Sequence, residues 1–275
     1  INGIGYKPGI LSRAGQGTLY VVVGVAGKTS YSYDGINWSA TSVISAAVNV
    51  NGIVYNGKDL WVAVATGGLT AYSHDGINWS STTNIFGGSD IESVFYGNNL
   101  WVAVGWGGKT AYSYDGINWS ATTNIFGGSF ILDVAYNGKD LWVAVGQSGK
   151  RSYSYDGINW SATTNIFGGS NISAISYNSR SLWVAVGNSG KTAYSYDGIN
   201  WSGTTNIFGG SSILDVAYNG KDLWVAVGGS GKTAYSYDGI NWSSTTDIFG
   251  SNDIYSIKYN GKDLWVSVGS IGLTA

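Results

Sequence analysis

One tract recurs along this chain at a nearly constant spacing, and this repetition restricts the possible folds more than any other feature. The copy at residues 223–243 reads LWVAVGGSGKTAYSYDGINWS. Its leading Leu-Trp step, once Leu-Tyr, begins at seven positions: Leu19, Leu60, Leu100, Leu141, Leu182, Leu223 and Leu264. Successive copies are therefore 41, 40, 41, 41, 41 and 41 residues apart. In such a repeat protein, each unit buries its apolar surface mainly against the neighbouring units.

Each unit has the apolar pattern and the turn residues of short β-strands. Both faces of the segment 223–228 are apolar, which is typical of a strand covered on both sides. Four strand-like segments follow one another here, at residues 213–219, 223–228, 233–238 and 241–246. Asn-Gly, Gly-rich and Asp-Gly tracts separate them, so we expect an antiparallel meander. A two-residue turn at Asp238-Gly239 would place Tyr235 opposite Trp242.

Four-stranded units of about 41 residues predict an all-β fold, a seven-bladed β-propeller in which residues 1–275 form a single domain. The last unit stops at Gly272–Ala275, after the start of its third strand. Asn2–Tyr6 reads NGIGY and resembles the DGINW end of other units. We therefore expect the N-terminal strand to close the last blade as its outer strand. The alternative is self-assembly, in which another molecule completes the terminal blade.

Composition excludes several classes of partner. The formal net charge is -2 and only 11% of residues are charged, so no basic field exists to bind nucleic acid. No apolar run approaches the roughly 18 residues that membrane insertion needs. The chain has no cysteine, hence no disulfide.

The tract YSYDGINW resembles the Asp-box of sialidase-like (BNR) propellers, whose pattern is Ser-x-Asp-x-Gly-x-x-Trp. Here Ser236, Asp238, Gly239 and Trp242 keep the residue types, but no residue separates Asp from Gly. The tandem WVAVG and YSxDGxxW units are also similar to propeller repeats predicted in large DNA viruses and bacteria. The resemblance implies structural turns rather than a catalytic site. The turn residues so implied are Asp34, Asp75, Asp115, Asp156, Asp197, Asp238, Trp38, Trp79, Trp119, Trp160, Trp201 and Trp242.

Catalysis is not expected. The resemblance implies that a sialidase would need an arginine cluster, a Tyr nucleophile with a Glu partner and an acidic Asp. This chain has three arginines, Arg13, Arg151 and Arg180, and one glutamate, Glu92. Near-identical repeats do not build the asymmetric constellation that an active site requires. A degenerate glycosidase-like propeller is the minor alternative.

Cofactors and metals are not expected either. The tract Ala226–Thr233 (AVGGSGKT) lacks the first glycine of a phosphate-binding loop, and a strand pattern follows it instead of a helix. His74 is the single histidine, and no calcium-loop pattern of aspartates occurs.

The repeats differ from one another mainly in two connections. Between the second and third strands one position holds, among others, Thr66, Trp106, Gln147, Asn188 and Ser270. The connection between units varies after its Gly-Gly-Ser, at Asp90, Phe130, Asn171 and Ser212. In an up-and-down blade both loops emerge on one face, so we expect the first five residues to be ligand-binding.

Two functions remain open. The first is a non-enzymatic, surface-displayed binding or adhesion propeller. Its specific form is a multivalent lectin, in which several similar weak sites together bind a glycan surface with higher avidity than any one of them. The second is a structural component of a virion, fibre or surface layer, motivated by the incomplete terminal unit. Either would be extracellular or on a virion or cell surface, with a glycan or a protein surface as partner.

Overall fold

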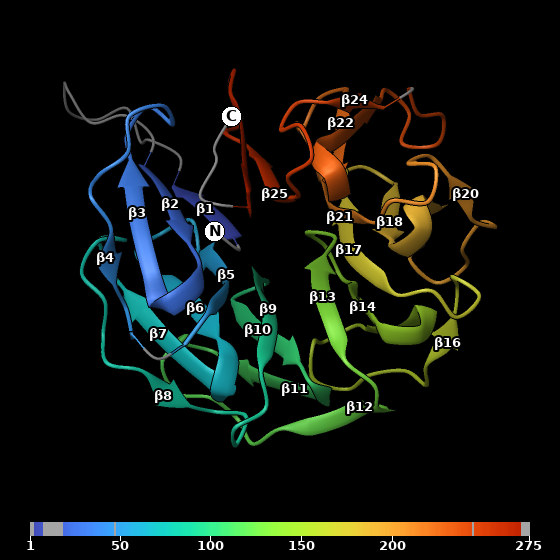
Figure 1. Ribbon diagram of the computed structural model, residues 1–275. Coiled ribbons are helices and arrows are strands. Elements are labelled where there is room, and N and C mark those ends of the chain that lie inside the picture. The colour runs from blue at the N-terminus through green and yellow to red at the C-terminus, as the bar shows by residue number, and fades with distance from the viewer. Residues whose placement is uncertain (1–2, 8–18, 47, 244, 271–275) are drawn as a thin grey trace.

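A computed structural model describes residues 3–7, 19–46, 48–243 and 245–270. Its sheets are arranged around a central axis, and each sheet runs from an inner strand to the rim (Figure 1). The inner strands are β1 (Gly3–Lys7), β5 (Val50–Tyr55), β9 (Ile91–Gly97), β13 (Ile131–Tyr136), β17 (Ile172–Tyr177), β21 (Ile213–Tyr218) and β25 (Ile254–Tyr259). Each inner strand contacts the next, and β25 contacts β1, so the ring of inner strands is closed.

The second, third and outer strands repeat around the ring. The second strands are β2 (Leu19–Val23), β6 (Trp61–Ala65), β10 (Leu100–Gly105), β14 (Trp142–Gly146), β18 (Trp183–Gly187), β22 (Trp224–Gly228) and β26 (Trp265–Gly269). The third strands are β3 (Lys28–Ser32), β7 (Leu69–Ser73), β11 (Gly107–Ser113), β15 (Lys150–Ser154), β19 (Lys191–Ser195) and β23 (Lys232–Ser236). The outer strands are β4 (Ser42–Val43), β8 (Thr83–Asn84), β12 (Thr123–Gly128), β16 (Thr164–Asn165), β20 (Thr205–Asn206) and β24 (Thr246–Asp247).

The expected all-β propeller is confirmed, but its expected seven four-stranded blades are wrong. The described residues form six four-stranded sheets, from β1–β4 to β21–β24, and one two-stranded sheet of β25 and β26. We call the six sheets the first to the sixth blade. Residues 272–275, on which part of the closure prediction rested, lie outside the described residues.

The predicted closure by an N-terminal outer strand is also wrong. β1 pairs with β2 and is the inner strand of the first blade. Tyr6 lies opposite Tyr20, in the register that places Tyr55 opposite Trp61 in the second blade. The sequence explains the difference, because NGIGY (2–6) matches the inner-strand tract NGIVY (51–55) more closely than it matches DGINW.

Separate apolar clusters fill the junctions between blades. Between the fifth and sixth blades, Leu182, Val184 and Val186 of one blade pack with Ile213 and Trp224 of the next. The tryptophan at or next to the start of the second strand is almost fully buried in five blades, as Trp61, Trp101, Trp142, Trp183 and Trp224. Removing one such side chain costs about 3–5 kcal/mol, so each junction contributes substantially to the stability of the fold.

The turn between the third and outer strands is wider than the expected two-residue turn. The backbone N–H of Ser243 donates to the carbonyl oxygen of Tyr235 (2.9 Å), so Tyr235 faces Ser243 and not Trp242. The cause is the Asp238 carboxylate, whose Oδ1 accepts hydrogen bonds from the amides of Ile240 (2.8 Å) and Asn241 (2.7 Å). These bonds open the turn and delay the outer strand until Thr246.

Connections between the second and third strands are short 3-10 turns in five blades: η1 (Val25–Gly27), η2 (Thr66–Gly68), η3 (Gln147–Gly149), η4 (Asn188–Gly190) and η5 (Gly229–Gly231). The tract that resembles a phosphate-binding loop runs from β22 through η5 into β23, so no α-helix follows it. None of the helices that the structure describes is long and apolar enough to cross a membrane.

Candidate functional site

The five residues predicted to bind a ligand occupy one equivalent position, in the turn between the second and third strands or where that turn begins. At each, the backbone N–H donates to the carbonyl oxygen of the residue that precedes the inner strand of the same sheet, at 2.9–3.0 Å. The donors are Thr66, Trp106, Gln147, Asn188 and Ser270, and their acceptors are Asn49, Asp90, Phe130, Asn171 and Asp253. The two variable connections therefore meet, and we call the surface that they form the turn face.

Most junctions on the turn face are bridged by an Asp or Asn side chain. The Oδ1 atom of Asp90, which precedes β9, accepts a hydrogen bond from the N–H of Gly67 in the second blade (2.7 Å). Asn171 accepts one from Ser148 in the same way (3.0 Å). Asn49 and Asp253 bridge to Ala26 (3.1 Å) and Ser230 (2.9 Å). An acceptor from one blade thus caps a turn of the preceding blade.

The junction between the third and fourth blades is built differently. Phe130 replaces the Asp or Asn, and its ring stacks on Trp106, with centroids 4.5 Å apart and 7° between the ring planes. The indole Nε1–H of Trp106 donates to Oε1 of Glu92 on β9 (2.5 Å). The backbone N–H of Phe130 donates to Oε1 of Gln147 (3.2 Å). Trp106 is nevertheless 40% exposed, so its ring is held in place while part of it faces solvent.

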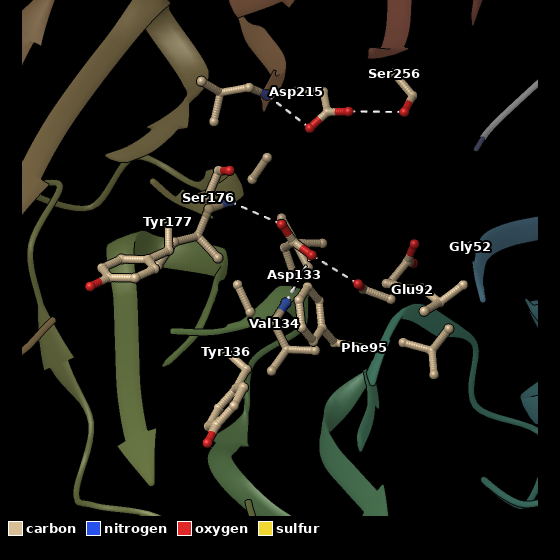
Figure 2. Close-up of a pocket in the computed structure, with 18 of the residues that line it drawn as sticks. Gly52, Glu92, Phe95, Asp133, Val134, Tyr136, Ser176, Tyr177, Asp215 and Ser256 are labelled. Carbon is tan, nitrogen blue, oxygen red and sulfur yellow. Dashed lines mark hydrogen bonds between the residues drawn. The ribbon is translucent and has the colours of Figure 1, made fainter. Parts of the chain in front are cut away.

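A channel of about 780 Å³ runs between the inner strands. Its lining includes three carboxylates, Glu92, Asp133 and Asp215, and the ammonium group of Lys258. Asp133 on β13 and Asp215 on β21 extend into the space between the strands (Figure 2). Glu92 belongs to this lining and also accepts from Trp106, so the channel and the turn face meet at this side chain.

Asp133 links three blades. Its Oδ1 accepts from the Ser93 hydroxyl (2.8 Å) on β9, and its Oδ2 accepts from the Ile175 amide (2.9 Å) on β17. Enclosure in the channel raises the pKa of Asp133 to about 6, although the hydrogen bonds from Ile175 and Ser93 act in the opposite direction.

Asp215 makes the corresponding link between the sixth blade and β25. Its Oδ2 accepts from the Ser256 hydroxyl (2.9 Å) and the Ile257 amide (3.0 Å), and lies 3.6 Å from Nζ of Lys258. The ring of inner strands is therefore joined by side-chain contacts as well as by packing.

Glu92 is the third acidic group of the channel. Burial raises the pKa of its carboxyl group, the hydrogen bond from Trp106 lowers it, and the nearby charge of Asp90 raises it further. The net direction is upward, so this carboxylate is destabilised by its surroundings.

The turns that carry the Asp-box-like tract lie between the third and outer strands. In each of the six blades, the aspartate Oδ1 accepts from the amide three residues later at 2.7 Å. Burial pushes the pKa of Asp197 up, but hydrogen bonds from Asn200, Ile199 and Ser195 outweigh it and lower this pKa to about 2. The turn tryptophans pack against the apolar clusters of the junctions, and Nε1–H of Trp201 donates to the Gly198 carbonyl oxygen (3.0 Å).

Residues that a sialidase-like site would need have other surroundings. Arg151 is 3% exposed, donates to the carbonyl oxygen of Ile199 in the next blade, and lies over the ring of Tyr153. Arg180 is exposed in the turn after β17, and Arg13 lies outside the described residues. In the part of the chain that the structure describes, no three His, Asp or Glu side chains gather to hold a metal ion.

Sequence reasoning missed the channel residues, although a comparison of the repeats contains a signal. The third position of the inner strand, from β5 to β25, holds Gly52, Ser93, Asp133, Ala174, Asp215 and Ser256. The position that follows is always Ile or Val. Carboxylates stand at the third position in two of these strands and hydroxyl groups in two others, which is the signal that a comparison along the strands contains.

The closed ring of sheets and its channel define the chain as a β-propeller. Solved propellers similar to it include YCF48 bound to a D1 peptide, with a TM-score of 0.75 and 17% identity over 98% of this chain and 89% of the other. YCF48 from Cyanidioschyzon merolae gives a TM-score of 0.72 and 18% identity over 99% and 93%. The WD40 propeller domain of Doa1 gives 0.78 and 10% over 100% and 90%. No protein-family model and no curated protein matches the chain.

Proposed function

We propose that this chain is a non-enzymatic propeller that binds an extended peptide segment of a protein partner on the turn face, beside Trp106 and the mouth of the channel. The observation that carries the proposal is the state of the Trp106 ring, which is stacked on Phe130 and bonded to Glu92 but 40% exposed. A tryptophan fixed before binding loses little conformational entropy when a partner covers it. Such residues commonly dominate the binding energy of interfaces.

A peptide fits the surroundings of this ring. Trp106 contacts Glu92 of the channel lining, and the channel also presents the hydroxyl groups of Ser173 and Ser176 on β17. An extended segment can place one side chain against the aromatic pair while the channel mouth binds its polar groups. A solved propeller of similar fold is bound to a peptide, which supports a protein partner as a class.

A lectin with several equivalent sites fits these residues less well. The side chains of Thr66 and Gln147 accept hydrogen bonds from the backbone amides of Asn49 (3.0 Å) and Phe130 (3.2 Å), so they support their own loops. Only Trp106 among the five predicted residues is aromatic. Glycan binding at a single site is the second candidate, since an exposed indole ring can also stack on a sugar.

A random peptide library displayed on phage tests the proposal. It is selected in parallel on the wild-type protein, on Trp106→Ala and on Asn188→Ala, which alters the equivalent position of another blade. We expect sequences enriched on the wild type and on Asn188→Ala but lost on Trp106→Ala. Thermal unfolding of each variant controls for folding.

Two other results would redirect the proposal. Enrichment that Trp106→Ala does not reduce would move the binding surface away from this junction. No enriched peptide, together with Trp106-dependent signals on a glycan array, would favour the single-site lectin. Ordered assembly in light scattering without any ligand would favour a structural component that assembles through β26.

A further inference from the structure

Glu92 occupies a position where its counterparts carry no charge. It is the second residue of β9, and the second residues of β5, β13, β17, β21 and β25 are Asn51, Leu132, Ser173, Leu214 and Tyr255. It is also the one glutamate of the chain. The same blade carries Trp106, and the next carries Phe130. Three departures from the repeat therefore meet at one junction.

No cation of the described residues is paired with Glu92. The ion pairs that the structure describes join Lys139 to Asp140, Lys258 to Asp215, and Lys262 to Asp263. Lys109, in the strand after Trp106, donates from Nζ to the carbonyl oxygen of Phe86 (2.8 Å) and to Oγ of Ser89 (2.9 Å). Its ammonium group is thus used at the junction with the second blade.

The carboxylate is therefore a partly buried acceptor whose observed partner is a neutral indole N–H. Removing a carboxylate from water without a compensating cation is unfavourable. Asp90 adds negative charge nearby, which favours a positive ligand over a neutral or anionic one.

The aromatic pair favours the same kind of ligand. One face of Trp106 is covered by Phe130, and the exposed part of the ring carries the negative quadrupole of an indole π-system. A cation within about 6 Å of such a ring is attracted to it, and arginine is the cation found there most often. A guanidinium group can stack on an aromatic ring and bind a carboxylate through two parallel hydrogen bonds.

We propose that Glu92, Trp106 and Phe130 form a binding site for the arginine side chain of a peptide. The guanidinium group stacks on Trp106 and donates to the Glu92 carboxylate at the channel mouth. This site rests on the proposed peptide-binding function and names the side chain that the turn face selects.

Two short probes that differ only in charge test the site. One is acetyl-Gly-Arg-Gly-amide, and the other has citrulline, a neutral side chain of nearly the same shape, in place of arginine. Binding is followed through the Trp106 indole N–H signal in proton–nitrogen correlation NMR spectra, assigned by its loss in Trp106→Phe. We expect the arginine probe to shift this signal saturably and to bind at least about tenfold more tightly than the citrulline probe, the loss typical of a removed charged hydrogen bond.

Glu92→Gln is the decisive variant, because it retains an oxygen acceptor for the indole N–H and removes the charge. We expect it to bind the two probes equally, whereas Asn188→Ala keeps the preference for arginine. Unchanged signals from the other indoles show that each variant is folded. If Glu92→Gln does not fold, the comparison of the two probes on the wild type, at low and high salt, still decides the matter.

Equal binding of the two probes to the wild type overturns the arginine site. Retention of the arginine preference in Glu92→Gln also overturns it, and places the cation at Asp133 or Asp215. After either result, the proposed peptide-binding function is still supported if library peptides without arginine require Trp106 for binding. If neither the probes nor the library peptides bind, both proposals fail.

Discussion

The Asp-box-like turns at one end of the blades and the turn face at the other end differ in how much their side chains vary. At the Asp-box-like turns, the bond from Asp Oδ1 to the amide three residues later is 2.7 Å in all six blades. On the turn face, the backbone bond at the variable position is equally constant, at 2.9–3.0 Å, but the side chain differs from blade to blade. Backbone geometry is therefore maintained at both ends, and the side chains vary more at the turn-face position than at the aspartate of the Asp-box-like turns.

Packing differs between the Asp-box-like turns and the connection that joins one blade to the next. A Cβ atom added at Gly198 in an Asp-box-like turn would lie 2.6 Å from Cδ2 of Leu141 and 3.0 Å from Nε1 of Trp183. One added at Gly168, in the connection between the fourth and fifth blades, would meet nothing within 4 Å. The Asp-box-like turns are therefore part of the junction cores, whereas this connection on the turn face has room to change.

The largest effect that we expect is the loss of stability on replacing the first of these two glycines with alanine, compared with the same change at the second. Both have positive φ, +72° at Gly198 and +59° at Gly168, so an alanine is strained at either position. Gly198→Ala also overpacks the junction core, and its total cost is about 2–4 kcal/mol in the free energy of unfolding. Gly168→Ala is the matched control and costs about 1 kcal/mol. Urea denaturation of both variants measures the difference, and equal losses would mean that the Asp-box-like turns are not part of the core.

A smaller effect distinguishes the Asp-box-like turns from the channel by pH. The pKa of Asp197 is lowered to about 2, so its stabilising contribution is present above the unfolded value of 3.8 and is lost as pH falls toward 2. The pKa of Asp133 is raised to about 6, so the folded state binds this proton more tightly than the unfolded state. The free energy of unfolding should therefore decrease as pH rises from about 4 to about 6, by about 2 kcal/mol.

Urea titrations from about pH 2 to about pH 6 measure both pH dependences. One variant changes the channel, and the other changes an Asp-box-like turn. Asp133→Asn should reduce the decrease between about pH 4 and 6, leaving the part that the raised pKa of Glu92 contributes, and Asp197→Ala should reduce the loss below about pH 4. If Asp133→Asn left the pH dependence unchanged, its carboxylate would not be perturbed as the channel geometry implies.

The all-β propeller could be predicted from the sequence because the information for it is local and repeated, whereas the predicted seven four-stranded blades were wrong. The Leu-Trp step and its spacing specify the second strand and the period, and Gly with Asn or Asp marks the turns. Closure was predicted wrongly because NGIGY is short enough to match two different strands of the unit. The closer match, to NGIVY, identifies the correct strand, and the observed partner of β1 is β2, the next strand along the chain.

The candidate site could be predicted only in part. Trp106 was found because it departs from its repeat, but its partners Phe130 and Glu92 come from an adjacent blade and from another strand. Their proximity depends on how blades pack, which a spacing rule does not give. The inner-strand carboxylates were overlooked because the repeats were compared at their loops and not along their strands.

We expect the smallest net change in the free energy of unfolding when the junction between the third and fourth blades is given the residues of the junction between the second and third blades. Gly107 at the aromatic junction has φ +71°, nearly the same as the +70° of Gly67, whose amide binds Asp90 at the preceding junction. The backbone beside Trp106 is thus already arranged to donate to a carboxylate at position 130. Trp106→Thr with Phe130→Asp should rebuild the Thr66, Gly67 and Asp90 arrangement of that neighbour.

A double-mutant cycle in urea measures the exchange. Each single change should cost about 1 kcal/mol, because it breaks the aromatic stack between Trp106 and Phe130. The double variant should lie within about 0.5 kcal/mol of the wild type, which corresponds to a favourable coupling of over 1 kcal/mol. It should also lose the peptides that depend on Trp106, since the new junction has no exposed ring. Strictly additive losses would instead mean that the two junction types are not interchangeable, and that the aromatic pair supports the blade contact itself.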